Sequence, residues 1–335
     1  MPSAGTTDLE VLIDGIFTRP SEDGVSLAVV VQQGGVVVAE RYGTKPENVF
    51  QPAQAIHADS TLVSWSMAKS ITHAAVGVLV RDGLLDVEAP APVPEWEGTE
   101  KAKITLLDLL EMKSGLRFVE DYVDDRTSHC IEMLFGESGP SHAAYAANLP
   151  LDHEPGTVWN YSSGTSNIIA RIIGDVVTGN FGGDSSVRQD AVGTFLRERL
   201  FGPTGMASAQ PKFDTAGDFV GSSYVYATAR DFARFGELYR HDGVTDLGRG
   251  DRILPEGWLD HARTQVATDP DTGFGYGRHW WMWPQFPGSV ACHGYEGQFT
   301  LVVPSRELVL VHLGLTPVDV APNLVRRLID LVESF

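Results

Sequence analysis

The segments of this chain with the composition of β-strands lie near its two ends, and segments with helical periodicity fill the middle. Residues 25–32 and 36–42 are rich in valine and are joined by Gln33-Gly34-Gly35, which predicts a β-hairpin. Three further runs that alternate as strands do lie at residues 274–283, 297–303 and 308–313. We therefore expect an α/β (α+β) fold, in which one antiparallel sheet is built from both chain ends and flanked by helices.

In the other segments, apolar residues recur at spacings of three or four, which is the pattern of amphipathic helices. The predicted helices comprise residues 8–19, 104–113, 141–148, 166–177, 191–200, 228–240 and 321–334, besides one that follows Ser66. A chain of 335 residues suits one large domain or two packed ones. We expect residues 1–65 and 250–335 to form an α/β domain, residues 66–249 to form an inserted, mainly helical domain, and the active site to lie between them.

The composition of the chain limits the kinds of binding partner and the cellular location that we expect. The net charge of −19 argues against nucleic acid or an anionic membrane as a partner, because both repel an acidic surface. Two cysteines, Cys130 and Cys292, do not make a disulfide framework. Residues 1–5 lack the pattern of a secretory signal and no apolar run is long enough to span a bilayer, so we expect a cytoplasmic location. Zinc-ligand spacings and dinucleotide-binding glycine motifs are missing from the sequence, and we expect neither a metal nor a cofactor.

The tetrapeptide Ser66-Met67-Ala68-Lys69 stands at the start of an apolar helical pattern. Residues three apart share one face of a helix, so the amine of Lys69 can lie beside the hydroxyl of Ser66. The first turn of a helix favours negative charge, which would stabilise a developing alkoxide and lower the pKa of Lys69. This spacing is the S-x-x-K signature of serine enzymes that work without a His–Asp pair. The interpretation is an acyl-transfer hydrolase, and the alternative is an ordinary helix start with a solvated lysine.

A serine–lysine pair also needs a proton shuttle and an oxyanion hole. Tyr161 follows a Pro155-Gly156 turn, before a helix that we expect Ser166 to cap, and its hydroxyl can act as a phenolate or pass a proton to the leaving group. Residues 292–299 hold two glycines before an apolar strand, where a backbone N–H can join that of Ser66 against an oxyanion. Considered alone, Tyr161 can equally be a buried structural residue. The glycine-rich segment can likewise be an ordinary hairpin.

Three segments of this chain resemble motifs of the serine β-lactamase/penicillin-binding-protein superfamily and follow one another in the same order. They are Ser66-x-x-Lys69, Tyr161-Ser162-Ser163 and His293-Gly294-Tyr295. More narrowly, the chain is similar to class C β-lactamase-related hydrolases, a group that includes family VIII carboxylesterases, D-aminopeptidases and 6-aminohexanoate-dimer hydrolase. The residues around 107–116 and 155–162 agree as well, and the likeness spans about residues 20 to 330. It implies a β-lactamase/transpeptidase-like fold with an inserted helical region.

The resemblance also implies a role for each residue of the motifs. Ser66 would be the nucleophile, Lys69 would keep Ser66 or Tyr161 deprotonated, and Tyr161 would act as general base and then as general acid. The backbone N–H groups of Ser66 and Tyr295 would form the oxyanion hole. The implied substrate-binding positions are Tyr122, Ser163 and His293.

Two of these positions depart from the family pattern, because Ser163 replaces the Asn of Tyr-x-Asn and His293 replaces the Lys of Lys-Thr-Gly. Losing a fixed cation should weaken the binding of anionic penicillins. We therefore expect a serine hydrolase, a carboxylesterase or amidase, that cleaves small ester or amide substrates through an acyl-enzyme on Ser66.

Two other functions remain open at this stage. One is a β-lactamase, D-aminopeptidase or DD-peptidase-like enzyme, and the other is a non-catalytic sensor that binds β-lactams or peptides. The expected partner is a small-molecule substrate, and the sequence leaves a homodimer open.

Overall fold

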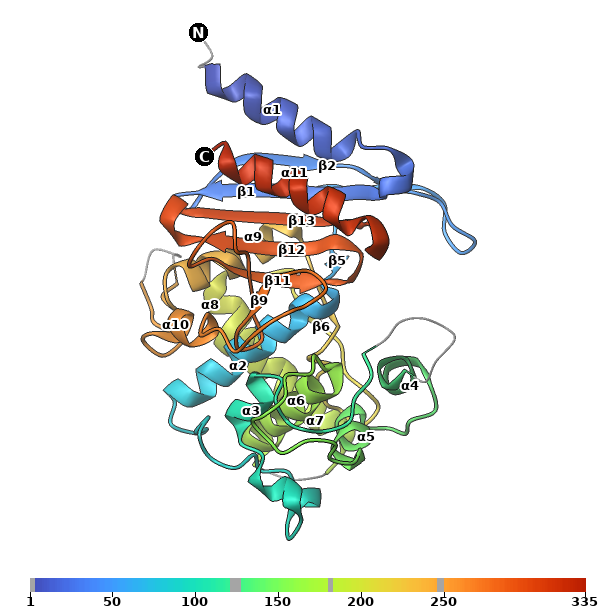
Figure 1. Cartoon of the computed structure of the whole chain (residues 1–335), viewed down its shortest axis with the longest axis vertical. Coiled ribbons are helices and arrows are strands. Elements are labelled where there is room, and N and C mark those ends of the chain that lie inside the picture. The colour runs from blue at the N-terminus through green and yellow to red at the C-terminus, as the bar shows by residue number, and fades with distance from the viewer. Residues whose placement is uncertain (1–3, 121–127, 180–182, 246–249) are drawn as a thin grey trace.

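The computed structural model describes residues 4–120, 128–179, 183–245 and 250–335, and its largest element is an eight-stranded sheet (Figure 1). The strand order is β2-β1-β13-β12-β11-β10-β9-β8, and all neighbours are antiparallel. Its strands are β1 (Val25–Gln33), β2 (Val36–Tyr42), β8 (Ala267–Thr268), β9 (Gly275–Tyr276), β10 (Trp281–Met282), β11 (Val290–Gly294), β12 (Gln298–Val303) and β13 (Leu308–Leu315). The pairing of β1 with β13 confirms the prediction of one antiparallel sheet from both chain ends.

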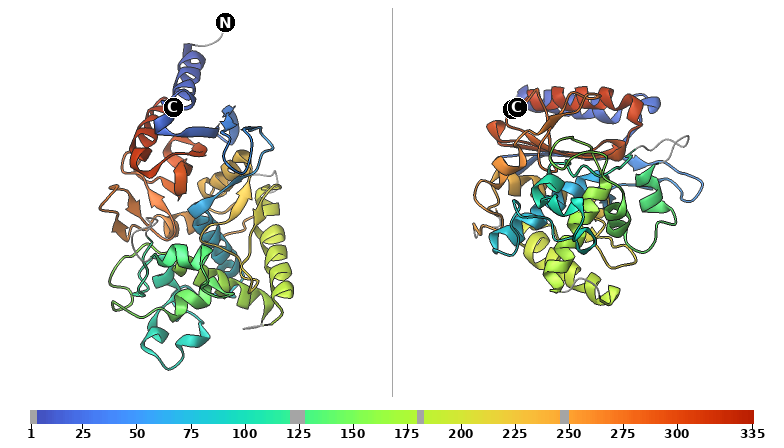
Figure 2. Two further views of the ribbon diagram at one scale, coloured as in Figure 1. Left: turned by 90° about the vertical axis from the view of Figure 1, so that its right-hand side faces the viewer. Right: turned by 60° about the horizontal axis from the view of Figure 1, so that its bottom comes forward.

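Both faces of this sheet are buried, which explains why its central strands are apolar along most of their length. The covering helices are α1 (Ala4–Phe17), α2 (Ala68–Arg81), α9 (Ala229–Arg240) and α11 (Ala321–Glu333). Val29 and Val31 of β1 share one core with residues of α1 and α11, whereas Ala28 and Val30 share the opposite core with residues of α2 and α9. Figures 1 and 2 show α1 and α11 together on one side of the sheet and α9 on the other.

A mainly helical region lies below the sheet in Figure 1, and α2 connects the two by contacting both β11 and α6. The region contains α3 (Leu106–Leu110), α4 (His129–Phe135), α5 (His142–Asn148), α6 (Ser163–Thr178), α7 (Ser185–Phe195), a π-helical turn (Leu196–Phe201) and α8 (Gly202–Thr204), and α10 (Trp258–Ala262) follows later in the chain. The predicted domain boundaries stay a prediction. Helix α9 belongs to residues 66–249, the predicted helical domain, but it packs on β1, β12 and β13 of the large sheet.

Two small sheets complete the fold. They consist of β3 (Thr44–Lys45) with β4 (Gln54–Ala55), and of β5 (Leu62–Val63), β7 (Val225–Ala227) and β6 (Gln210–Pro211). The second one matters for function because β5 leads directly to Ser66. In the part of the chain that the structure describes, no helix has the length and apolar composition needed to cross a membrane.

Three of the differences between the sequence predictions and the fold concern the large sheet and the helices near Ser66. Residues 274–283 form β9 and β10 rather than one strand, because the chain turns between them, where Gly277 N–H donates to Trp280 O at 2.8 Å and His279 has a φ of 60°. Helix α6 is capped by Ser162, and Ser166 lies inside it, since the helix begins earlier than predicted. Helix α4 was not predicted at all.

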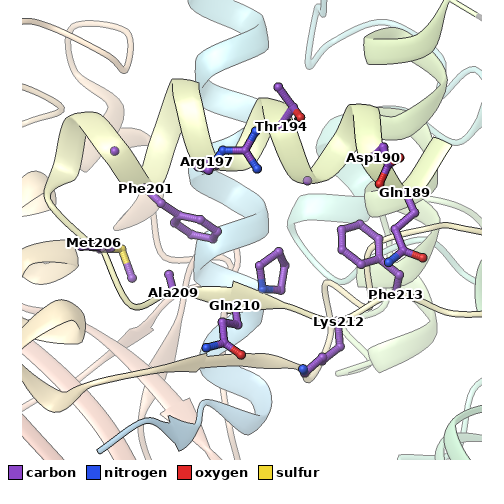
Figure 3. A pocket seen from close by; sticks show the side chains of 14 residues that line it. Gln189, Asp190, Thr194, Arg197, Phe201, Met206, Ala209, Gln210, Lys212 and Phe213 are labelled. Carbon is purple, nitrogen blue, oxygen red and sulfur yellow. Dashed lines mark hydrogen bonds between the residues drawn. The ribbon is translucent and has the colours of Figure 1, made fainter. Parts of the chain in front are cut away.

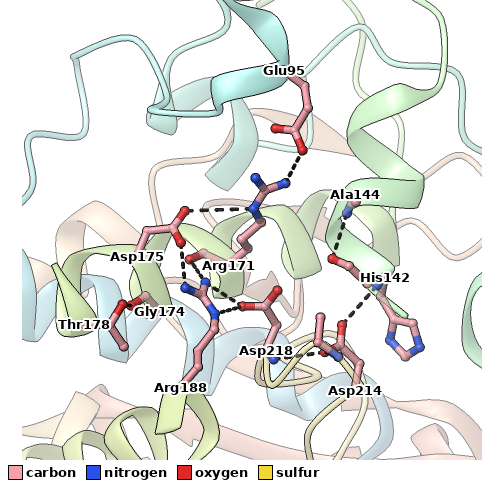
Figure 4. A network of polar contacts seen from close by, with 12 residues as sticks. Glu95, His142, Ala144, Arg171, Gly174, Asp175, Thr178, Arg188, Asp214 and Asp218 are labelled. Carbon is pink, nitrogen blue, oxygen red and sulfur yellow. Dashed lines mark hydrogen bonds and ion pairs between the residues drawn. The ribbon is translucent and has the colours of Figure 1, made fainter. Parts of the chain in front are cut away.

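A buried ionic network fixes α6 against α7 (Figure 4). Arg188 of α7 donates to Asp218 at 2.6 Å and to Asp175 of α6 at 2.7 Å. It also donates to the backbone oxygen of Arg171 at 2.8 Å. Because both carboxylates lie on one guanidinium, the network holds in place the helix whose first residue is Ser163.

Candidate active site

Ser66 lies in a 3₁₀ turn between β5 and the buried helix α2. The residue before it, Trp65, has a φ of 44°, a conformation that residues other than glycine rarely adopt. Ser64 anchors the turn, because its N–H donates to Val225 O at 2.9 Å and its hydroxyl accepts from Val225 N–H at 3.0 Å. Main-chain bonds to β7 therefore fix the backbone that carries the Ser66 hydroxyl.

The amine of Lys69 contacts the hydroxyl of Ser66, as their spacing on a helix predicts. Nζ lies 3.0 Å from Ser66 Oγ, 2.9 Å from Ser163 Oγ and 3.0 Å from the backbone oxygen of Ser222. Lys69 is only 2% exposed, so the alternative of a solvated lysine is wrong. Three acceptors match the three hydrogens of an ammonium group.

Burial lowers the pKa of Lys69, while the charge of Glu120 and then that of Cys130 act in the opposite direction. Burial has this effect because a low-dielectric environment disfavours the charged form of an amine. A lower pKa increases the share of neutral amine at neutral pH. Neutral Lys69 can accept the proton of Ser66 across the 3.0 Å contact between them.

Glu120 is a residue of this site that the sequence analysis did not assign. Its Oε1 accepts from Ser163 Oγ at 2.5 Å, and its Oε2 accepts from Ser163 N–H at 2.7 Å. Ser163 thus connects a carboxylate to Lys69, although the resemblance implied only that it binds substrate. The available signal was an acidic residue two positions before Tyr122, and Tyr122 itself lies outside the described residues.

Tyr161 lies beside the serine–lysine pair, with its ring centroid 4.8 Å from Lys69 Nζ. Asn160 anchors its loop by donating from its N–H to Met112 O at 2.8 Å and from its side chain to Phe118 O at 3.0 Å. Burial and the charge of Glu120 raise the pKa of the Tyr161 phenol, against the effect of a hydrogen bond with Ser66. The phenol is therefore protonated at neutral pH, which favours Lys69 as the base and Tyr161 as a proton donor.

Tyr295 follows β11 and lines the same cavity as Ser66. This cavity of about 240 Å³ is lined by Trp65, Ser66, Cys130, Ile131, Leu134, Phe135, Ser223 and Tyr295. Gln298 holds the turn by donating to Tyr295 O at 2.9 Å. A Cβ on Gly294 would lie 2.3 Å from Ser64 O, so only glycine allows the two turns to approach so closely. An oxyanion hole formed by the N–H groups of Ser66 and Tyr295 stays a prediction.

His293 is packed in an aromatic cluster. Its ring stacks on Trp281 at a centroid distance of 5.1 Å, and its Nε2 accepts from Trp283 Nε1 at 2.8 Å. Burial lowers the pKa of His293 to about 3, so its imidazole is neutral at physiological pH. His293 therefore supplies no cation in place of the family lysine, and its predicted contact with substrate remains a prediction.

Chemistry, rather than cavity size, locates the site. Figure 3 shows a larger groove of about 650 Å³, beside α7 and β6, to which Arg197, Phe201 and Lys212 contribute. None of the residues lining that groove lines the cavity beside Ser66. Among the described residues, no group of three or more His, Cys, Asp or Glu side chains is arranged to hold a metal ion.

A model of a known protein family matches most of this chain. A model described as beta-lactamase matches residues 13–324 of this chain. The chain belongs to the beta-lactamase family. Its family membership makes this protein an enzyme of the serine hydrolase type.

Individual relatives of this beta-lactamase family member cover nearly the whole chain. The 6-aminohexanoate-dimer hydrolase of Paenarthrobacter ureafaciens is 27% identical over 333 residues, which cover 92% of this chain and 78% of the relative. A structure described as a candidate 6-aminohexanoate-dimer hydrolase from Bacillus anthracis has a TM-score of 0.72 at 24% identity and covers 97% of this chain and 82% of its own. The structure of a family VIII carboxylesterase has a TM-score of 0.72 at 15% identity and covers 99% of this chain and 98% of its own. The two structures show that the fold is shared.

Proposed function

We propose that this protein hydrolyses small ester or amide substrates through an acyl-enzyme on Ser66. The observation that carries the proposal is the 3.0 Å contact between the buried Lys69 amine and the Ser66 hydroxyl. The names of similar proteins, an amide hydrolase of 6-aminohexanoate dimer and a carboxylesterase, support the same substrate classes.

In the acylation step, Ser66 Oγ attacks the carbonyl carbon of the substrate and its proton moves to Lys69 Nζ. The carbonyl oxygen becomes an oxyanion, which we expect the N–H groups of Ser66 and Tyr295 to bind. The bond to the leaving group then breaks, and Tyr161 gives its proton to the departing oxygen or nitrogen. Lys69 returns a proton to Tyr161, which leaves both groups in their starting states and an ester on Ser66.

Deacylation follows the same route with water in place of the leaving group. Water loses a proton to Lys69 as its oxygen attacks the acyl carbon, and Lys69 gives that proton to Ser66 Oγ as the bond between Ser66 and the acyl carbon breaks. The products are a carboxylic acid and free enzyme.

The cavity beside Ser66 favours a neutral, apolar group on the substrate. Its lining includes Ile131, Leu134 and Phe135, and none of the described residues that line it is a Lys, Arg, His, Asp or Glu. His293 is neutral as well, since burial lowers its pKa to about 3. In penicillins a carboxylate lies beside the scissile bond. Such a carboxylate would thus lack the cationic partner that the family lysine supplies. We expect poor turnover of β-lactams compared with short esters.

Hydrolysis assays test this proposal. Purified protein should cleave p-nitrophenyl acetate and butyrate or a small linear amide, and the Ser66→Ala variant should lose that activity by at least about 10³-fold. Nitrocefin serves as the competing substrate. Failure to cleave any ester or amide, or full activity in Ser66→Ala, would contradict the proposal, and nitrocefin turnover comparable to ester turnover would favour a β-lactamase instead.

A further inference from the structure

Glu120 makes two contacts to a single residue at the start of α6. Its carboxylate accepts from Ser163 Oγ at 2.5 Å and from Ser163 N–H at 2.7 Å. A carboxylate at a helix N-terminus is favourable because it satisfies a free N–H and opposes the helix dipole. Glu120 is therefore held in place by the backbone as well as by the hydroxyl.

These contacts determine how the Ser163 hydroxyl is oriented. A serine hydroxyl carries one hydrogen, and here that hydrogen points to Glu120, so the oxygen presents lone pairs to Lys69 Nζ at 2.9 Å. The backbone oxygen of Ser222, 3.0 Å from Nζ, can also only accept. A neutral amine has two hydrogens and one lone pair. With both hydrogens donated to Ser163 and Ser222, the lone pair faces Ser66, which is the remaining hydrogen-bond partner of Nζ among the described residues.

We propose that Glu120 is a positioning residue of this hydrolase, which orients the Ser163 hydroxyl so that the free electron pair of Lys69 faces Ser66. The inference rests on the proposed function, because it assigns Lys69 as the base. Without the carboxylate, the Ser163 hydrogen is free to point at Lys69 and compete with Ser66 for the same lone pair.

The charge of Glu120 has a second effect on the same amine. It raises the pKa of Lys69, against the larger effect of burial. Within the described parts of the chain, the other titratable groups around the amine are Cys130, Tyr161 and His279. His279 is neutral near pH 7, since burial lowers its pKa to about 3, and Tyr161 is protonated. Glu120 has the largest charge effect on Lys69 among these groups, so its removal should lower the pKa of that amine.

The test is the rate at which a fluorophosphonate labels Ser66, measured as a function of pH. In this reaction Ser66 Oγ forms a bond to phosphorus, fluoride leaves and the hydroxyl proton goes to Lys69. Glu120→Gln should lower the plateau rate roughly 10- to 100-fold, as expected for a misoriented base. It should also move the midpoint of the rising pH limb to lower pH, because the negative charge that raises the pKa of Lys69 is gone. A merely structural role would leave that midpoint unmoved.

Two further variants separate orientation from charge. Ser163→Ala should lower the plateau by a similar factor and shift the midpoint less, since Glu120 stays charged. The double variant should lose no more than the more damaged single variant, because both changes break one chain of contacts. The exposed Glu137→Gln removes the same charge from the surface and should behave as wild type.

The outcomes distinguish this inference from the proposed function. Wild-type rates with an unmoved midpoint in Glu120→Gln, or losses that multiply in the double variant, would overturn the positioning role. If Glu120→Gln does not fold, as judged by near-UV circular dichroism, Ser163→Ala alone decides, and an unchanged plateau there overturns the role. A wild-type protein that is labelled at Ser66 but cleaves no ester or amide would contradict the proposed function alone. Absence of labelling would contradict both.

Discussion

At the scale of single residues, the site depends on opposite pKa shifts in two neighbouring groups. Burial lowers the pKa of Lys69, and burial raises the pKa of Tyr161. Burial thus favours the neutral form of both groups, so that the neutral amine can accept a proton and the phenol can donate one. Enzymes commonly assign acid and base roles by separating pKa values in this way.

These shifts predict the pH dependence of ester hydrolysis. Since the base must be deprotonated, kcat/KM should rise with pH along a limb whose midpoint lies below 10.5, the ordinary pKa of a lysine. Tyr161 should cause no alkaline decline near pH 10, because its pKa is raised above that value. The measurement is a pH–rate profile with a short p-nitrophenyl ester, corrected for spontaneous hydrolysis. An alkaline decline near pH 10 that disappears in Tyr161→Phe would show that the phenol titrates normally.

At the scale of elements, α4 supplies the apolar wall of the cavity beside Ser66. Ile131 and Leu134 of this helix line the cavity of about 240 Å³. Ile131→Trp should fill much of it and lower the ratio of kcat/KM for a hexanoate over an acetate ester by about tenfold or more. Glu132→Trp, an exposed position on the same helix, should leave the ratio unchanged. Equal losses of kcat/KM for both esters would indicate that the acyl group binds outside this cavity.

The contact between α6 and α7 predicts a second effect at this scale (Figure 4). Arg188→Met leaves the buried carboxylate of Asp218 without its contacting cation and leaves Asp175 with only Arg171, 3.9 Å away, which should cost about 3–5 kcal/mol of unfolding free energy. Arg117→Met breaks an exposed pair with Asp152 and should cost less than about 1 kcal/mol. Urea unfolding followed by circular dichroism measures both variants. Similar small losses would mean that the buried network contributes little.

At the scale of the whole molecule, the fold buries several neutral histidines. Burial lowers the pKa of His261, His279, His293 and His312 to about 3. In the unfolded chain these groups titrate near 6.5, so below that pH the unfolded state binds more protons than the folded state. Their contribution to stability is therefore complete above pH 6.5 and is lost as pH falls from about 6.5 towards 3.

The expected result is a loss of unfolding free energy between pH 7.5 and 5, by about 1.4 kcal/mol per pH unit for each histidine well below pH 6.5. Urea unfolding at several pH values measures this slope. His312, whose Nδ1 lies 2.6 Å from Gly297 O, offers a control. His312→Gln should make the slope shallower by about one proton even if the variant is less stable overall. An unchanged slope would show that His312 does not stay neutral in the folded protein.

Local patterns in the sequence predicted much of this fold. The valine-rich runs of β1 and β2 and the amphipathic helices α9 and α11 carry their own periodicity, so their positions follow from local composition. The break between β9 and β10 does not, because it depends on tertiary packing: a Cβ on Gly277 would lie 2.1 Å from Ala262 O.

The contacts of the active site likewise include some that local sequence predicts and others that depend on tertiary packing. The contact between Ser66 and Lys69 follows from spacing on one helix, and so it was predictable. The contact of Glu120 with Ser163 joins residues 43 positions apart, and the backbone oxygen of Ser222 reaches Lys69 from 153 positions away. The residue types along the chain do not specify such long-range contacts, since every backbone carbonyl is an acceptor and acidic residues are common.

The central claim is that Ser66 carries the acyl group during turnover. The most direct measurement is mass spectrometry of the enzyme stopped by acid during hydrolysis of a short p-nitrophenyl ester, followed by peptide mapping. The account predicts an added acyl mass on the peptide that contains Ser66, and its absence in Ser66→Ala. An acyl group on any other residue during turnover, or the same adduct retained in Ser66→Ala, would contradict it.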